Sequence, residues 1–351
     1  MFLFIIIVPH KQLIYSYFNK RSIFVIKPSD YFNFLLLNKT YEEISHFLNN
    51  KYNNNNSKKI KKNKKKKRIN LFSVDLFNFK MHIRWLKNKL SEHFIIKLNS
   101  QNPDYLLFNN FGRRHLNIKY NNAIKIAILT ENRIPDLNYS DYALGHSHIF
   151  YLDKYFKHSI LLFVNYKNIN KVREQVLKQP LRRKFCAAVI SNSFRGDRFR
   201  LKFINELNKY KKVDMGGRYK NNVGGKIKNK IEFLSSYKFS IAMENSEGDG
   251  YVSEKIIQSF ISGTIPIYYG DYMIDEFINP KSYILIKGEK DLRTKINYIK
   301  EIDNNENQYR KLLKENVIID ENFAIKIDNE LKAFLYNIFI QDKQKAFRRL
   351  E

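Results

Sequence analysis

Short apolar runs alternate with amphipathic stretches along most of the chain, which is the pattern of buried strands separated by helices. Each run has five to nine residues and is bounded by polar residues or glycine. These runs predict strands at 69–77, 104–108, 123–129, 148–152, 185–191, 237–243, 264–270 and 283–288.

The intervening stretches have the 3.6-residue period of helices that cover a sheet. The segment 82–94 places Ile83, Leu86, Leu90 and Phe94 on one face. The segment 197–210 directs Phe199, Phe203, Ile204 and Leu207 inward, 253–263 predicts a further helix, and a set of helices follows toward the C-terminus.

Strand–helix–strand repetition predicts an α/β protein whose parallel sheets carry helices on both faces. We expect two Rossmann-like domains with a ligand cleft outside the carboxyl ends of the strands. The composition divides the chain into an N-terminal extension (1–68), a first domain (69–178) and a second domain with the terminal helices (179–351).

One low-complexity tract supplies almost a third of the net charge of +29. Nine of the eleven residues from Lys58 to Arg68 are Lys or Arg, next to an Asn-rich run. Such a tract is typically a solvated tether, and contact with an anion, a nucleic acid or a membrane surface is the alternative. The apolar start (MFLFIIIVP) is far shorter than the ~20 residues of a membrane span, so we expect a buried strand there and a cytoplasmic protein, with weak membrane-surface contact through the tract left open.

The single cysteine, Cys186, excludes an intrachain disulfide and a cysteine-based metal site. The sequence has no Asp-x-Asp metal motif near the stretch discussed next. We therefore expect no obligatory metal, with Mn²⁺ or Mg²⁺ at most stimulating activity.

Residues 239–271 (FSIAMENSEGDGYVSEKIIQSFISGTIPIYYGD) combine two buried runs with a polar, glycine-containing loop. Glu244 and Asn245 follow the first strand, where ligands bind in open α/β sheets, and the two glycines at 248 and 250 allow a tight turn. Ser253 is a plausible N-cap of the following helix, whose free N–H groups and Lys255 suit a phosphate, while Glu254 suits sugar hydroxyls. The alternative is that these are ordinary first-turn charges beside a loop.

The same stretch resembles the signature block of the α-1,3/α-1,4-fucosyltransferases, glycosyltransferase family 10. That pattern is F-E-N-S, a short loop, Y-V-T-E-K, a helix and G-x-x-P-x-Y-x-G, and Ser253 replaces its usual Thr. Similar segments are AVISNSFRGDRFRLKFINELNKYKKVDMGG, NPDYLLFNNFG and AILTENRIPDLNYSDYALG, so that the likeness covers about residues 69 to 345.

The resemblance implies a GT-B fold that transfers L-fucose from GDP-β-L-fucose to N-acetylglucosamine or glucose in a glycan acceptor, with inversion. It implies that Glu131, of E-N-x-x-P-D, is the general base in the first domain. A carboxylate at the end of a predicted strand fits that role, although the residues alone favour a loop charge beside the turn at Pro135 and Asp136.

The resemblance also implies a donor site at the second sheet, with Arg200 and Lys255 on the diphosphate, Glu254 on hydroxyls, and Asn245 and Tyr251 lining the nucleotide pocket. Arg198 competes with Arg200, and Glu244 and Ser253 are further candidates. Tyr251 as a core residue and Asn245 as a loop cap are the alternatives.

The chain departs from the family after DYALG, where His146 and Ser147 replace Phe-Asp and Asp153-Lys154-Tyr155 replaces Asp-Arg-Tyr. These departures leave the acceptor and the linkage open, and the oligomeric state is not predicted. Other functional hypotheses are a GT-B enzyme for another nucleotide sugar, an inactive homologue that only binds, and a nucleic-acid-binding protein. No nucleic-acid-binding motif supports the last of these, so no specific nucleic acid is expected.

Overall fold

The computed structural model describes residues 4–6, 23–25, 66–76, 79–149, 152–158, 168–179, 183–191, 198–246 and 250–349. By internal contacts the chain divides into two compact units. The N-terminal unit comprises Met1–Thr130, Ile134–Lys157 and Lys332–Glu351, and the C-terminal unit comprises Glu131–Arg133 and His158–Leu331.

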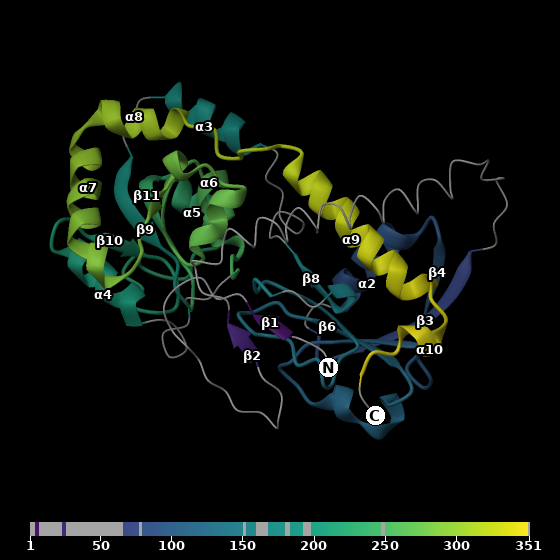
Figure 1. Cartoon of the computed structure of the whole chain (residues 1–351). Helices are drawn as coiled ribbons and strands as arrows, with labels where there is room; N and C mark the ends of the chain where they lie inside the picture. The colour runs from purple at the N-terminus through teal and green to yellow at the C-terminus, as the bar shows by residue number, and fades with distance from the viewer. Residues whose placement is uncertain are drawn as a thin grey trace. The chain divides into compact units, whose positions relative to one another are not determined.

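The N-terminal unit is built on a six-stranded parallel sheet with the order β4-β3-β5-β6-β7-β8 (Figure 1). The strands are β3 (Lys67–Val74), β4 (Phe94–Leu98), β5 (Tyr105–Phe108), β6 (Ile124–Ile128), β7 (Tyr142–Gly145) and β8 (Tyr155–Lys157). All residues of β5, β6 and β7 are buried, as expected for parallel strands covered on both faces. A separate two-stranded parallel sheet pairs β1 (Phe4–Ile6) with β2 (Ile23–Val25).

Helix α2 (Phe79–Leu90) covers this sheet with the face predicted from the sequence. Ile83, Leu86 and Leu90 are buried. Phe94 was predicted on the same helix and instead begins strand β4, so that part of the prediction is wrong. The helix ends at Leu90, whose carbonyl accepts from the His93 N–H, and the three-residue turn keeps Phe94 in helical phase by coincidence.

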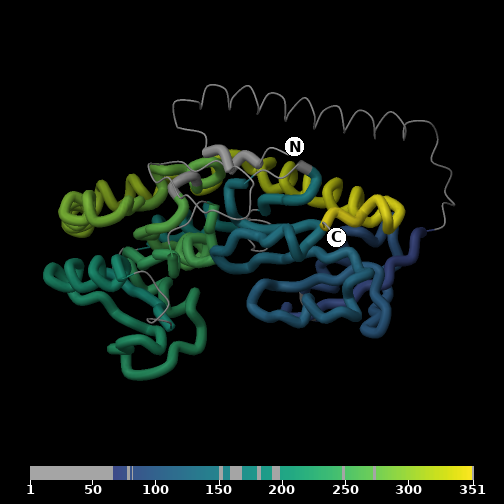
Figure 2. Tube along the Cα trace, turned by 60° about the horizontal axis from the view of Figure 1, so that its bottom comes forward, coloured from purple at the N-terminus to yellow at the C-terminus, as the bar shows by residue number. Residues whose placement is uncertain are grey.

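The last residues of the chain also pack on the N-terminal sheet, which the predicted boundaries assigned to the second domain. Helix α9 (Phe323–Ile340) brings Phe339 to 4.6 Å from the Tyr105 ring and 5.9 Å from the Phe94 ring, measured between ring centroids. Lys67 Nζ donates to the carbonyls of Ile340 (3.3 Å) and Gln341 (2.8 Å), which caps the end of this helix. Figure 2 shows the end of α9 and α10 (Lys343–Ala346), in yellow, alongside the blue strands.

The basic tract ends inside this unit. Strand β3 begins at Lys67, two residues before the predicted domain start, so Lys67 and Arg68 belong to the sheet. Lys66 Nζ donates to the Ser91 carbonyl (2.7 Å), just after helix α2. The rest of the tract, 58–65, lies outside the described residues.

The C-terminal unit is built on a five-stranded parallel sheet with the order β10-β9-β11-β12-β13. The strands are β9 (Lys184–Ala188), β10 (Val213–Met215), β11 (Tyr237–Met243), β12 (Ile265–Tyr269) and β13 (Ile284–Leu285). Its helices are α3 (Ile169–Leu177), α4 (Arg198–Asn208), α5 (Lys230–Ser235), α6 (Glu254–Ile261), α7 (Leu292–Asn304) and α8 (Glu306–Lys314).

Successive residues of β12 face two different helical layers. Ile267 packs in a cluster with residues of α4, α7 and α8, and Tyr268 packs in a second cluster with residues of α3 and α6. The buried face of α4 consists of the four residues predicted, together with Arg200. The parallel α/β class expected from the sequence is therefore confirmed in both units.

Two further differences concern short strands. The predicted strand 148–152 is not formed as such: Leu152–Lys154 is a 3-10 turn, and β8 follows it. Residues 150 and 151 lie outside the described residues. Strand β7, over the DYALG segment, was not predicted. Across the described ranges, no helix is long and apolar enough to cross a membrane.

Candidate active site

The polar residues after β11 lie at the carboxyl end of the C-terminal sheet. The Glu244 N–H donates to the Tyr269 carbonyl (2.8 Å), which continues the pairing of β11 with β12 by one residue. Helix α6 begins ten residues later, and its N-cap is Ser253, as predicted. The chain therefore brings a strand end and a helix N-terminus to the same place, the usual ligand-binding edge of such sheets.

The Glu244 carboxylate is fully buried and joins these two elements. It accepts hydrogen bonds from the Ser253 N–H (2.8 Å) and the Ser253 hydroxyl (2.7 Å to Oε2), and Lys255 Nζ lies 2.6 Å from its Oε2. The Lys255 ammonium also donates to Ser253 Oγ (2.8 Å). Glu244 and Ser253 thus bind each other and Lys255, and they hold the first turn of α6 against the sheet.

Two glycines make this arrangement sterically feasible. A Cβ on Gly270 would lie 2.8 Å from Glu244 Cγ and 2.5 Å from the Tyr268 hydroxyl, so the residue after β12 must lack a side chain. Gly250 has a φ of 91°, which L residues with side chains rarely adopt. It precedes Tyr251 and turns the loop back toward α6. The other predicted loop glycine, Gly248, lies outside the described residues.

Arg200 and Arg198 both lie on the first turn of α4, and they differ in environment. The Arg200 side chain is buried, and its Nη1 donates to Asn245 Oδ1 (2.9 Å). Arg198 is exposed. Arg200 is thus the arginine that is in contact with a residue of the signature loop.

Glu131 and Tyr251 are in direct contact. The Tyr251 hydroxyl donates to Glu131 Oε2 (3.0 Å), and Asn132 Nδ2 donates to Ser246 Oγ (3.0 Å). The sequence predicted Glu131 in the first domain, but its segment, Glu131–Arg133, groups with the C-terminal unit. Burial, together with the carboxylates of Glu244 and Glu131, raises the pKa of Tyr251 far above its ordinary value, so its hydroxyl stays protonated as a donor.

Family models match most of the described chain. The model described as "Alpha-(1,3)-fucosyltransferase FucT N-terminal domain" matches residues 71–188, and "Glycosyltransferase family 10 (fucosyltransferase) C-term" matches residues 179–322. The second match contains the Glu244–Lys255 cluster and Arg200.

The chain belongs to the fucosyltransferases of glycosyltransferase family 10.

Similar proteins of this fucosyltransferase family include an α-(1,3)-fucosyltransferase of Helicobacter pylori, which is 32% identical over 65% of this chain and 55% of its own length. A putative fucosyltransferase of Acanthamoeba polyphaga mimivirus is 32% identical over 44% of this chain and 28% of its own length. The chain therefore matches about half or less of the length of these curated relatives.

Solved α1,3-fucosyltransferase structures share the fold, which is of the GT-B type predicted. A crystal structure of an α1,3-fucosyltransferase with GDP has a TM-score of 0.66 and 27% identity, covering 81% of this chain and 94% of that one. Another, with GDP-fucose, has a TM-score of 0.62 and 28% identity, covering 78% and 93%.

One residue beside helix α6 was not identified from the sequence. Lys230 begins helix α5, is half-buried, and donates from Nζ to Gln258 Oε1 on α6 (2.6 Å). Its sequence signal was weak, because a lysine in a lysine-rich segment looks like any solvated charge. Glu254, in contrast, was predicted and lies exposed at the start of α6.

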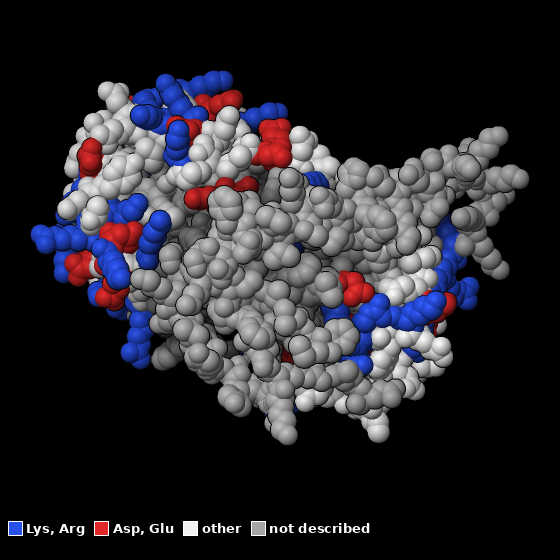
Figure 3. All heavy atoms as spheres, in the orientation of Figure 1, with Lys and Arg blue, Asp and Glu red and all other residues white. Residues whose placement is uncertain are grey.

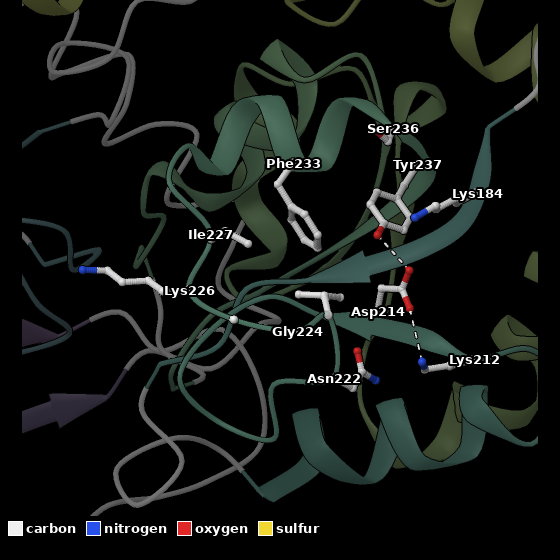
Figure 4. A pocket seen from close by; sticks show the side chains of 12 residues that line it. Lys184, Lys212, Asp214, Asn222, Gly224, Lys226, Ile227, Phe233, Ser236 and Tyr237 are labelled. Atoms are coloured by element: carbon white, nitrogen blue, oxygen red, sulfur yellow. Dashed lines mark hydrogen bonds and ion pairs between the residues drawn. The ribbon is translucent and has the colours of Figure 1, made fainter.

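A hollow of about 640 Å³ lies elsewhere on the C-terminal unit (Figure 4). Its lining includes Lys184 and Tyr237, the first residues of β9 and β11, and Asp214 of β10. The Tyr237 hydroxyl donates to Asp214 Oδ2 (2.8 Å), and Lys226 points away from this pair. The first residues of β9 and β11 lie at the opposite edge of the sheet from Glu244, so the hollow is separate from the residues of the fucosyltransferase signature.

Proposed function

We propose that this protein transfers L-fucose from GDP-β-L-fucose to a hydroxyl of an N-acetylglucosamine or glucose unit in a glycan, through an α-1,3 or α-1,4 linkage and with inversion. The observation that carries the proposal is the hydrogen bond between Tyr251, in the signature loop, and Glu131, in the second motif of the family. It supports a single site in which a carboxylate stands beside the donor-binding loop.

Glu131 acts as the general base in this proposal. It removes the proton of the acceptor hydroxyl while the hydroxyl oxygen bonds to C1 of fucose, and the bond from C1 to the GDP oxygen breaks. Attack from the face opposite GDP inverts the configuration at C1. The exposed Glu131 side chain, fixed at one oxygen by Tyr251, leaves its other oxygen for the acceptor.

Arg200 and Lys255 bind the leaving diphosphate, with Asn245 orienting Arg200. The hydrogen bond from Arg200 Nη1 to Asn245 supports this assignment and favours Arg200 over Arg198. Glu254, exposed at the start of α6, binds ribose or fucose hydroxyls, and Tyr251 lines the nucleotide pocket. Ser253 and Glu244 hold the loop and α6 in place rather than contacting the donor.

The chain is proposed to work without an obligatory metal, with residues 69–178 on the acceptor side and residues 179–351 binding the donor. Among the described residues, no cluster of three or more His, Cys, Asp or Glu forms a candidate metal site. The proposed partners are GDP-fucose and a glycan, the location is cytoplasmic, and weak contact of the basic tract with a membrane surface stays a prediction.

A donor and acceptor screen tests the proposed function. The full chain is incubated with GDP-fucose, GDP-mannose, UDP-galactose or UDP-glucose and a panel of lactosamine, lactose and simple N-acetylglucosamine acceptors. We expect GDP release from GDP-fucose alone, dependent on the acceptor, and an α-linked fucose at O3 or O4 by NMR. Turnover of another nucleotide sugar instead would establish the alternative GT-B activity.

The distribution of charged side chains on the surface gives little support to the alternative that the protein binds nucleic acid. Figure 3 shows basic and acidic side chains interleaved over α7 and α8 rather than a continuous basic stripe. Glu306 and Arg310 form one such pair, 2.8 Å apart. Deleting residues 58–65 is expected to abolish polyanion binding and leave fucose transfer unchanged.

A further inference from the structure

The lysine of the signature motif does not carry an uncompensated charge. Lys255 Nζ lies 2.6 Å from the Glu244 carboxylate, whose side chain has no exposed area. At this distance the two charges largely cancel for any group beyond them. A diphosphate bound at the start of α6 therefore needs other cations for net electrostatic attraction.

Lys230 lies near the first turn of α6, which carries Lys255. Its ammonium is close enough to Glu254, Lys255 and Glu244 for their charges to act on its pKa. Lys230 Nζ contacts Gln258 Oε1, one helical turn beyond Glu254 on α6. The contact places the ammonium along the face of α6 that carries Glu254.

The Lys230 ammonium is not paired with an acid. Within the described ranges, Gln258 is its one hydrogen-bond partner and it forms no ion pair. Burial lowers the pKa of Lys230; the charge of Glu254 opposes this shift, Lys255 adds to it, and Glu244 opposes it by a smaller amount. A half-buried ammonium group that forms no ion pair is stabilised in its charged form by a bound anion.

We propose that Lys230 is a further donor-binding residue, whose ammonium contacts the diphosphate of the nucleotide sugar together with Arg200. This inference rests on the proposed function, because it takes the nucleotide diphosphate as the ligand at the start of α6. An ammonium group has three N–H donors, so Lys230 can keep its hydrogen bond to Gln258 through one of them and bind a phosphate oxygen through another.

Binding of GDP, GMP and guanosine by titration calorimetry tests the proposal on the full chain. Lys230→Met is compared with Lys228→Met, an exposed lysine two residues away that makes no described contact. We expect Lys230→Met to weaken GDP binding about tenfold to a hundredfold, GMP less, and guanosine by less than twofold. The KM for GDP-fucose rises in parallel, and Lys228→Met matches the wild type.

Two further variants separate binding from structural support. Gln258→Leu removes the partner but keeps the ammonium, and is expected to bind GDP within about twofold of the wild type. Lys230→Gln keeps a hydrogen bond to Gln258 but loses the charge, and is expected to behave like Lys230→Met; it also serves if the Met variant does not fold.

The outcomes distinguish this inference from the function on which it rests. If the wild type binds GDP and Lys230→Met and Lys230→Gln bind it equally well, the inference is wrong and the proposed function stands. Equal losses in Lys230→Met and Gln258→Leu, or losses shared by guanosine, also overturn it, since they indicate a structural role. A wild type that neither binds GDP nor releases it from GDP-fucose overturns both.

Discussion

The Tyr251 hydroxyl donates a 3.0 Å hydrogen bond to Glu131, which is 120 positions earlier in the chain. The bond joins the two family motifs that the sequence could only assign to separate roles. It holds one carboxylate oxygen of the proposed base, so the proposed roles of Tyr251 are to line the nucleotide pocket and to orient Glu131. The first two predictions follow from it.

Glu131→Gln is expected to abolish transfer without loss of donor binding. The amide is similar in shape and still accepts from Tyr251, but it cannot take a proton, so kcat falls by about 10²–10⁴-fold. Stopped GDP-release assays measure kcat, and calorimetry with GDP measures binding. Unchanged turnover would remove Glu131 from the base role, and lost GDP affinity would indicate a folding defect instead.

Tyr251→Phe is expected to lower kcat about tenfold, equivalent to ~1.4 kcal/mol, with little change in the KM for GDP-fucose. The ring keeps its packing, and only the donor to Glu131 is lost. The comparison is made in the Glu131→Gln background as well, where the same substitution should have almost no further effect. If the two substitutions lower kcat by independent factors that multiply in the double variant, Tyr251 acts on the bound GDP-fucose rather than on Glu131.

Breaking the Glu244–Lys255 ion pair is expected to destabilise the protein as well as to lower its transfer activity. Lys255→Met leaves the fully buried Glu244 carboxylate without its cation, at a cost of about 3–5 kcal/mol. Glu244→Gln/Lys255→Met is expected to be more stable than the sum of the single losses by about 2 kcal/mol, because neither charge is then left alone.

Urea unfolding of the four proteins in this cycle measures the coupling free energy. Strictly additive losses would mean that the pair contributes nothing beyond its separate contacts. A loss of activity in Lys255→Met must be judged against this destabilisation before it is assigned to phosphate binding.

Removal of divalent metal ions by a chelator is not expected to abolish fucose transfer. In the proposed site, Arg200 and Lys230 supply to the diphosphate the positive charge that a divalent ion would otherwise provide. Activity after dialysis against EDTA should stay within about twofold of the untreated enzyme, and added Mn²⁺ or Mg²⁺ at most stimulates it. Activity that EDTA abolishes and Mn²⁺ restores would contradict this prediction.

The strand pattern, the inward face of α4 and the N-cap at Ser253 were predictable, because each depends on residues close in the sequence. The end of α2 was not, since Phe94 continues the helical phase across a turn that only the fold reveals. Strand β7 is four buried residues ending in glycine, too short for its period to be recognised.

At the site, the motifs identified Glu131 and Tyr251, but not that they touch. The pairing of Lys255 with Glu244, and the contact of Lys230 with Gln258, depend on how α5, α6 and β11 meet. The local sequence does not show whether a lysine is paired with a carboxylate, because the pairing depends on contacts between elements that are separate in the chain. This is why the sequence did not single out Lys230 and did not show that Lys255 is paired with Glu244.

The last prediction concerns Lys125, the second residue of strand β6, which is 3% exposed. Burial, with a smaller contribution from Arg349, lowers the pKa of Lys125 from 10.5 to about 8, although Asp141 opposes the shift. Below pH 8 the folded chain must keep this buried lysine charged. Between about pH 8 and 10.5 the unfolded chain binds more protons than the folded one, so the contribution of Lys125 to stability increases with pH.

Lys125→Met is therefore expected to be more stable than the wild type at pH 7, by up to about 3 kcal/mol, and the difference should shrink above pH 8. Lys97→Met, an exposed lysine of β4 in the same sheet, is the control and should show no such trend. Urea unfolding at pH 7, 8, 9 and 10 measures the three proteins. A difference that stays constant across this range would mean that the stability gain comes from packing of the methionine and not from the titration of Lys125.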